Sequence, residues 1–135
     1  MHATVPPSEC PPTTQSTTSG YAACTDELIS AAWCVSEFAS ALSIKLRTGQ
    51  IDEAAVRTAW RQFERMCAND LVLLPLEPGT FHRAAVLTLD ASSGLRAGDA
   101  LHLATALDTK ARSMATLDEV LARNCRRMKL KLVAL

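Results

Sequence analysis

The sequence has 135 residues, with 14 Lys and Arg against 14 Asp and Glu, and 48% of its residues are hydrophobic. The length is that of a single domain, and the composition is ordinary for a globular protein. Zero net charge excludes a strong overall field that would draw the chain to nucleic acid or a membrane. No apolar run approaches the roughly 18 residues of a membrane span.

Residues 1–22 are predicted to be a disordered tail. The first 20 hold four of the six prolines together with many Thr and Ser residues, a composition that buries too little surface to offset chain entropy. Residues 23–135 are therefore predicted to be the folded domain.

Within that domain, apolar runs and helical spacing alternate. In chain order they predict a strand at 28–35, helices at 36–49 and 52–67, a strand at 71–76, helices at 80–91 and 95–107, a strand at 113–117, a helix at 118–128 and a strand at 131–135. Gly49 is expected to end the first helix, and Asp52 to cap the second. Alternating strands and helices with short connections predict an α/β fold with a mostly parallel sheet.

The five cysteines are an odd number with no C-x-x-C pair. This pattern favours free thiols in a reducing cytoplasm over a disulfide framework or a zinc site. The amino-terminal segment has neither the basic start nor the apolar region of a secretory signal. The cysteines are Cys10, Cys24, Cys34, Cys67 and Cys125.

Three acids, Glu37, Asp99 and Asp118, fall at or near the expected starts of helices. Each alone is explained by helix capping or by the helix dipole. In a parallel α/β sheet, however, the carboxyl ends of the strands and the helices that follow them share one edge, where such folds bind ligands. Carboxylates gathered there would repel one another unless a cation lay between them, which suggests Mg²⁺ or Mn²⁺.

The segments "SEFASAL" (36–42), "GLRAGDALHLATAL" (94–107) and "ATLDEVLA" (115–122) resemble, in their order and spacing, the PIN-domain ribonucleases, in particular the VapC-type toxins of bacterial toxin-antitoxin pairs. The resemblance covers roughly residues 25–135. It implies that Glu37, Asp99 and Asp118 are catalytic acids that bind Mg²⁺ or Mn²⁺, and that Thr116 helps to place a water. It also implies hydrolysis of RNA phosphodiester bonds, a cognate antitoxin as partner, and a homodimer.

One part of the pattern is missing. Members of the family begin with a central strand that ends in an aspartate of a "D-T-S" motif, a principal metal ligand, and no segment here corresponds to it. We therefore expect a PIN-like sheet that is truncated or altered at its amino terminus. Either the flanking strands close up, or the tail takes the place of the strand, or the reading frame is damaged or misassigned.

Other residues have two interpretations each. His102 follows Asp99 by three residues and is predicted to be a hydrogen-bonded histidine at the margin of the core rather than a contact to RNA or antitoxin. Arg96 is either a phosphate or carboxylate contact or an ordinary surface arginine. Trp33 and Trp60 are interpreted as core or dimer-contact residues rather than as platforms on which bases stack.

A basic cluster near the carboxyl end either contacts RNA or complements a helix dipole. It consists of Arg123, Arg126, Arg127, Lys129 and Lys131. Two alternatives to the ribonuclease remain open: a non-catalytic PIN-like module that binds an antitoxin or a second copy of the chain, and an unrelated α/β protein with three helix-capping acids.

Overall fold

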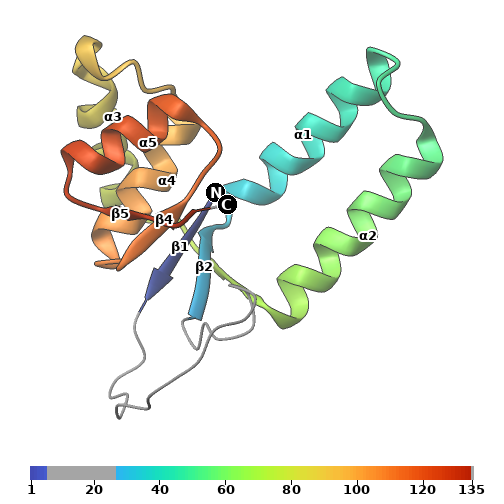
Figure 1. The fold of residues 1–135 in the computed structure, drawn as a ribbon, viewed down its shortest axis with the longest axis horizontal. Coiled ribbons are helices and arrows are strands. Elements are labelled where there is room, and N and C mark those ends of the chain that lie inside the picture. The colour runs from blue at the N-terminus through green and yellow to red at the C-terminus, as the bar shows by residue number, and fades with distance from the viewer. Residues whose placement is uncertain (6–26, 135) are drawn as a thin grey trace.

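The computed structural model describes residues 1–5 and 27–134 (Figure 1). Its elements are β1 (His2–Val5), β2 (Glu27–Ala31), α1 (Trp33–Arg47), α2 (Glu53–Asn69), β3 (Leu71–Leu74), α3 (Pro78–Leu89), the short 3₁₀ helix η1 (Ala91–Ser93), α4 (Ala97–Asp108), β4 (Ser113–Ala115), α5 (Glu119–Arg127) and β5 (Lys131–Leu132). The predicted α/β class is confirmed.

The five strands form one sheet in the order β3-β2-β1-β4-β5. The outer pairs, β2 with β3 and β4 with β5, are parallel, whereas β1 is antiparallel to both of its neighbours. In register, Ala3 lies opposite Ile29 on one side and Met114 on the other. Four strands therefore run in one direction, and only the central strand opposes them.

The central strand corrects the prediction for the amino-terminal segment. Residues 1–22 were expected to be a disordered tail, but residues 2–5 form β1 in the place where the family strand is missing. Of the three outcomes considered for that gap, the tail takes the place of the strand. The physical reason is that β2 and β4 would otherwise face each other with unpaired backbone groups, which β1 satisfies on both sides. Residues 6–26 lie outside the described part of the chain.

The strand predicted at 28–35 is too long. β2 ends at Ala31, and Trp33, Cys34 and Val35 form the first turn of α1. An apolar run of this length is compatible with either a strand or a buried helix start, so its boundary is not encoded in periodicity. As a consequence, Glu37 lies one turn inside α1 instead of in its first turn.

The ends of the first two helices follow the prediction. Gly49 has a φ of +71° directly after the C-cap residue of α1, a left-handed conformation that glycine adopts without strain. The Asp52 side chain caps α2 by accepting a hydrogen bond from the Ala55 N–H at 2.7 Å.

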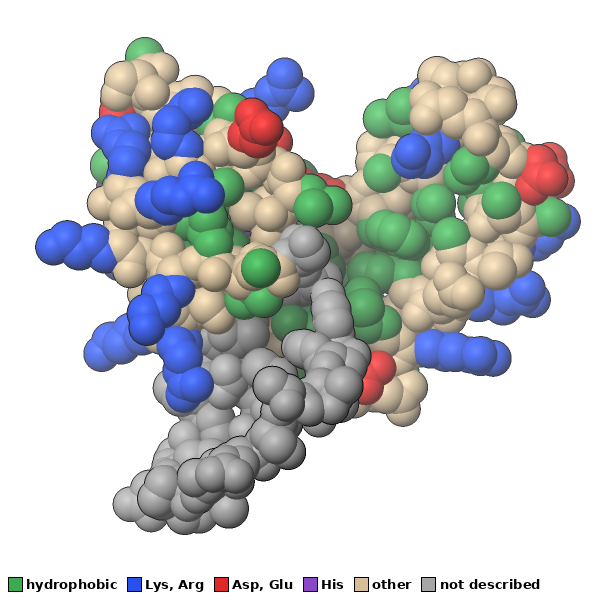
Figure 2. All heavy atoms as spheres, in the orientation of Figure 1, with side chains coloured by type: hydrophobic (Ala, Val, Ile, Leu, Met, Phe, Trp, Pro, Cys, Tyr) green, Lys and Arg blue, Asp and Glu red, His purple; other side chains and the backbone are tan. Residues whose placement is uncertain are grey.

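Helix α4 lies at the centre of the main core. Seven consecutive residues from Ala100 to Ala106 are buried, and they pack with residues of β1, β2, β4 and α5 that include Ala3, Ile29, Met114 and Leu121. Helices α1 and α2 form a separate arm that extends away from the other helices (Figure 1). A second, smaller core of Cys34, Phe63 and Leu71 holds the base of this arm, and Figure 2 shows hydrophobic side chains on the side of the arm that faces the rest of the molecule.

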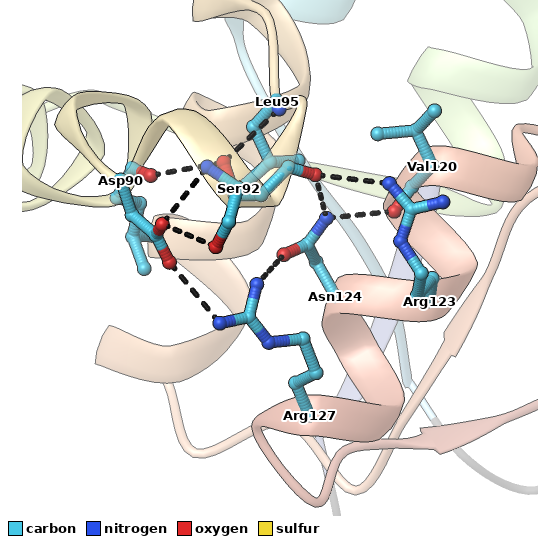
Figure 3. Close-up of polar contacts among 9 residues, drawn as sticks. Asp90, Ser92, Leu95, Val120, Arg123, Asn124 and Arg127 are labelled. Atoms are coloured by element: carbon cyan, nitrogen blue, oxygen red, sulfur yellow. Dashed lines mark hydrogen bonds and ion pairs between the residues drawn. The ribbon is translucent and has the colours of Figure 1, made fainter.

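A buried asparagine ties the segment before α4 to α5 (Figure 3). Asn124 is 1% exposed, and its amide donates to the carbonyl oxygens of Ser93 and Val120, both at 2.8 Å. The Arg123 guanidinium donates to the same Ser93 carbonyl at 3.2 Å, and Arg127 pairs with Asp90 at 3.1 Å. These contacts fix the start of α4 relative to the start of α5.

We predict that Asn124→Ala lowers the free energy of unfolding by about 1–3 kcal/mol, because the buried hydrogen bond from the Asn124 amide to the Ser93 carbonyl oxygen is lost. Urea unfolding measures the effect. Asn69→Ala is the matched control, since the Asn69 amide also donates to a carbonyl of its own helix but is exposed; it should change the free energy of unfolding by about 0.5 kcal/mol or less. Equal losses of stability in the two variants would contradict a special role for the buried Asn124 hydrogen bonds.

Candidate active site

The three predicted acids line one pocket. Strands β2 and β4 run in the same direction, so α1 and α5 both follow from the same edge of the sheet. The start of α4 lies between them. The pocket has a volume of about 530 Å³ and is lined by Glu37, Gly94, Arg96, Gly98, Asp99, Asp118 and Val120. Residues separated by more than 80 positions in the sequence thus face one space.

Glu37 is held by a histidine of the neighbouring helix. Its Oε2 lies 2.5 Å from Nε2 of His102, which is 3% exposed. Burial lowers the pKa of His102, and the bond and charge of Glu37 act against that lowering. The prediction that His102 is a hydrogen-bonded histidine at the margin of the core is confirmed, and its partner turns out to be one of the three acids.

The close approach of α1 to α4 depends on a glycine. A Cβ atom placed at Gly98 would overlap the Glu37 carboxylate oxygen Oε1 and would lie 3.3 Å from Nε1 of Trp33. Gly98 therefore leaves the space that the carboxyl group of Glu37 occupies beside the first turn of α4. Neither this glycine nor the pairing of Glu37 with His102 could be found from the sequence, because no spacing links residues 65 positions apart.

Asp118 is held by hydrogen bonds at the start of α5. It is the N-cap of α5, where its Oδ1 accepts from the Leu121 N–H at 2.7 Å. The Thr116 hydroxyl oxygen accepts from the Asp118 N–H at 3.0 Å. Thr116 thus supports the turn that carries Asp118, and it is not among the residues that line the pocket.

Asp99 is the acid of the pocket whose pKa is raised. Its side chain makes no hydrogen bond or ion pair with the described residues. Burial raises its pKa, as do the negative charges of Asp118 and Glu37, while the charges of His102 and Arg96 act in the opposite direction. The pocket therefore gathers negative charge that a cation would stabilise.

The donor set suits a hard divalent cation only in part. Within residues 1–5 and 27–134, no three His, Cys, Asp or Glu side chains are arranged closely enough to enclose a metal ion. Mg²⁺ keeps several water ligands, however, and is commonly bound through one or two carboxylates. Asp99 and Asp118 line the same pocket and influence each other electrostatically, so they are the carboxylates to test as ligands.

The basic cluster lies outside the lining of this pocket, although the Arg123 guanidinium is beside Gly94. Arg126 and Arg127 are in the last turn of α5, where they complement the helix dipole, and Arg127 pairs with Asp90. None of the five residues of the cluster lines the pocket, whereas Arg96 does. Arg96 is therefore the basic side chain that lines the acidic pocket.

The role of Gly98 can be tested against a second glycine in an equivalent position. Gly98 and Gly79 are each the second residue of a helix, but a Cβ at Gly79 meets no atom within 4 Å. Gly79→Ala should therefore stabilise the protein against urea by about 0.5–1 kcal/mol. Gly98→Ala should show no gain, because Glu37 must leave its place beside His102. An equal gain in both variants would contradict the close approach.

The raised pKa of Asp99, caused by burial and by the charges of Asp118 and Glu37, predicts a pH-dependent gain in stability for Asp99→Asn. Because the pKa of Asp99 is raised on folding, its ionised form destabilises the native state at neutral pH, and this cost disappears at acid pH where the carboxyl group is protonated. With a chelator present, Asp99→Asn should raise the thermal midpoint at pH 7 and leave it nearly unchanged at pH 3–4. A lower thermal midpoint for the variant at pH 7 would contradict a destabilising effect of ionised Asp99.

Comparison with known proteins agrees with this arrangement. Residues 21–127 match the PIN domain family, whereas no curated protein and no solved structure gives a significant match. The match covers α1, α2, α4 and α5 and includes the whole acidic pocket. No helix in the described part of the chain is long and apolar enough to cross a membrane. The chain belongs to the PIN domain family.

Proposed function

We propose that the protein is a metal-dependent endoribonuclease of the VapC type, the toxin of a type II toxin-antitoxin system. The observation that carries the proposal is the pocket in which Glu37, Asp99 and Asp118 converge from three helices. PIN-domain membership makes a nuclease-like activity the natural use of such a pocket. The toxin role rests on the resemblance of the motifs around these acids to VapC-type sequences.

In this proposal Asp99 and Asp118 hold a Mg²⁺ or Mn²⁺ ion, with Glu37 as a third acid beside it. The bound ion would supply a Lewis acid that stabilises a phosphodiester under attack by water. His102 keeps the Glu37 carboxylate at the pocket wall. Arg96, at the rim, is placed to contact a phosphate of the RNA. Thr116 acts through Asp118 by supporting its backbone.

The proposed partners are RNA, a cognate antitoxin whose tail lies across the acidic pocket, and a second copy of the chain. The proposed location is the cytoplasm, and the three described cysteines, Cys34, Cys67 and Cys125, are free thiols as that location requires. The proposed domain is the segment 23–135 together with the amino-terminal strand β1.

A non-catalytic interaction module is the second candidate. It is favoured by the absence of a three-ligand metal group among the described residues. It is also favoured by the direction of β1, whose carboxyl end points to the edge of the sheet opposite the pocket. An aspartate at the end of this strand could not reach the site as the family aspartate does.

Cleavage of RNA separates the two candidates. We expect purified protein to cleave a structured RNA in Mn²⁺, and Asp99→Asn to reduce the rate by about 10- to 100-fold or more, as loss of metal-site groups does. Asp108→Asn is the matched control, since Asp108 ends the same helix and pairs with Arg83 away from the pocket; it should cleave like the wild type. Cleavage that is absent in the wild type favours the module, and equal cleavage by Asp99→Asn refutes Asp99 as a ligand.

A further inference from the structure

A large aromatic side chain lies exposed beside the acidic pocket. Trp33 is the first residue of α1, and 40% of its surface is exposed. It precedes Glu37 by four residues, so both side chains project from the same face of the helix, and both line a hollow on that face. Neither the core packing nor the chemistry of the three acids uses this indole ring.

The indole ring reaches the start of α4. Its Nε1 would lie 3.3 Å from a Cβ atom at Gly98, the residue before Asp99. Because Gly98 has no side chain, the ring lies directly against the backbone that carries the acid. Trp33 therefore lies beside Gly98, the neighbour of Asp99 in the chain.

The ring has no aromatic partner in the described part of the chain. The stacked and tilted ring pairs all belong to Phe38, Trp60 and Phe63 in the arm. On its other side Trp33 borders an apolar hollow of about 540 Å³, together with Phe81, Ala84, Ala97 and Leu101. The hydroxyl of Thr88, the one polar side chain there, already donates to the Ala84 carbonyl oxygen.

We propose that Trp33 is the platform on which an unpaired base of the RNA stacks while the adjoining phosphodiester lies in the acidic pocket. Any base can stack on an indole, because every base has an aromatic face. The substrate class is therefore single-stranded RNA or a loop, recognised by an exposed base rather than by base identity. The inference rests on the proposed ribonuclease function and deepens it.

The two tryptophans of the chain allow a direct optical test. In Trp60→Phe, the emission reports Trp33 alone, and in Trp33→Phe it reports Trp60 alone. The probe is a cleavage-resistant phosphorothioate single strand, compared with the same strand annealed into a duplex. We expect the single strand to quench Trp33 and leave Trp60 unchanged, and the duplex to quench neither.

Affinity gives a second, independent readout. Trp33→Leu should weaken binding of the single strand about ten-fold or more, and Trp33→Phe should restore most of the loss. Unchanged Trp33 emission at saturating single strand, or equal binding by Trp33→Leu, overturns the role of Trp33 even where the RNA cleavage of the wild type is intact. Emission that changes with protein concentration rather than with RNA also overturns it and identifies a contact between copies. If the wild type binds no RNA, the proposed function itself fails.

Discussion

Convergence of Glu37, Asp99 and Asp118 on one pocket is the constraint around which this edge of the molecule is organised. Each acid is accommodated differently: Glu37 by His102, Asp118 by the N-terminal amide of α5, and Asp99 by no described hydrogen-bond donor. A structure that needed these acids only as helix caps would have no reason to bring three of them to one pocket. Burial and the charges of Asp118 and Glu37 raise the pKa of Asp99, and a bound cation would act against that rise.

The rest of the fold holds the three acids in place. The buried face of α4 fixes Asp99, the Asn124 contacts link the start of α4 to α5 and thus to Asp118, and Gly98 permits α1 to bring Glu37 close. The antiparallel β1 completes the sheet beneath the pocket but contributes no acid to it. Among the described residues, three carboxylates therefore line the pocket, and none of them comes from the central strand.

Several features of this arrangement could be predicted from sequence. The order of the elements after β1, the α/β class and the Asp52 cap followed from periodicity and local chemistry. The rule that parallel strands end at one edge explains why Glu37 and Asp118 meet, because α1 follows β2 and α5 follows β4. Asp99 joins them although α4 follows the 3₁₀ helix η1 and not a strand. The end of β2 could not be predicted, because "LISAAWCV" is apolar throughout and its change to helix at Trp33 is decided by packing. Nor could the β1 strand, whose four residues gain their stability from pairing with strands far along the chain. The bond between Glu37 and His102 is likewise a tertiary contact without a local signal.

The proposed ribonuclease function depends on one property of the molecule, the binding of a divalent cation in the acidic pocket. Calorimetric titration of the purified chain with Mn²⁺ tests it without reference to any substrate. We expect saturable binding of Mn²⁺ by the wild type, a much weaker affinity in Asp118→Asn, in which an amide replaces the carboxylate, and wild-type affinity in Asp90→Asn, an acid away from the pocket. No heat of binding in the wild type, or the same affinity in all three proteins, would contradict it.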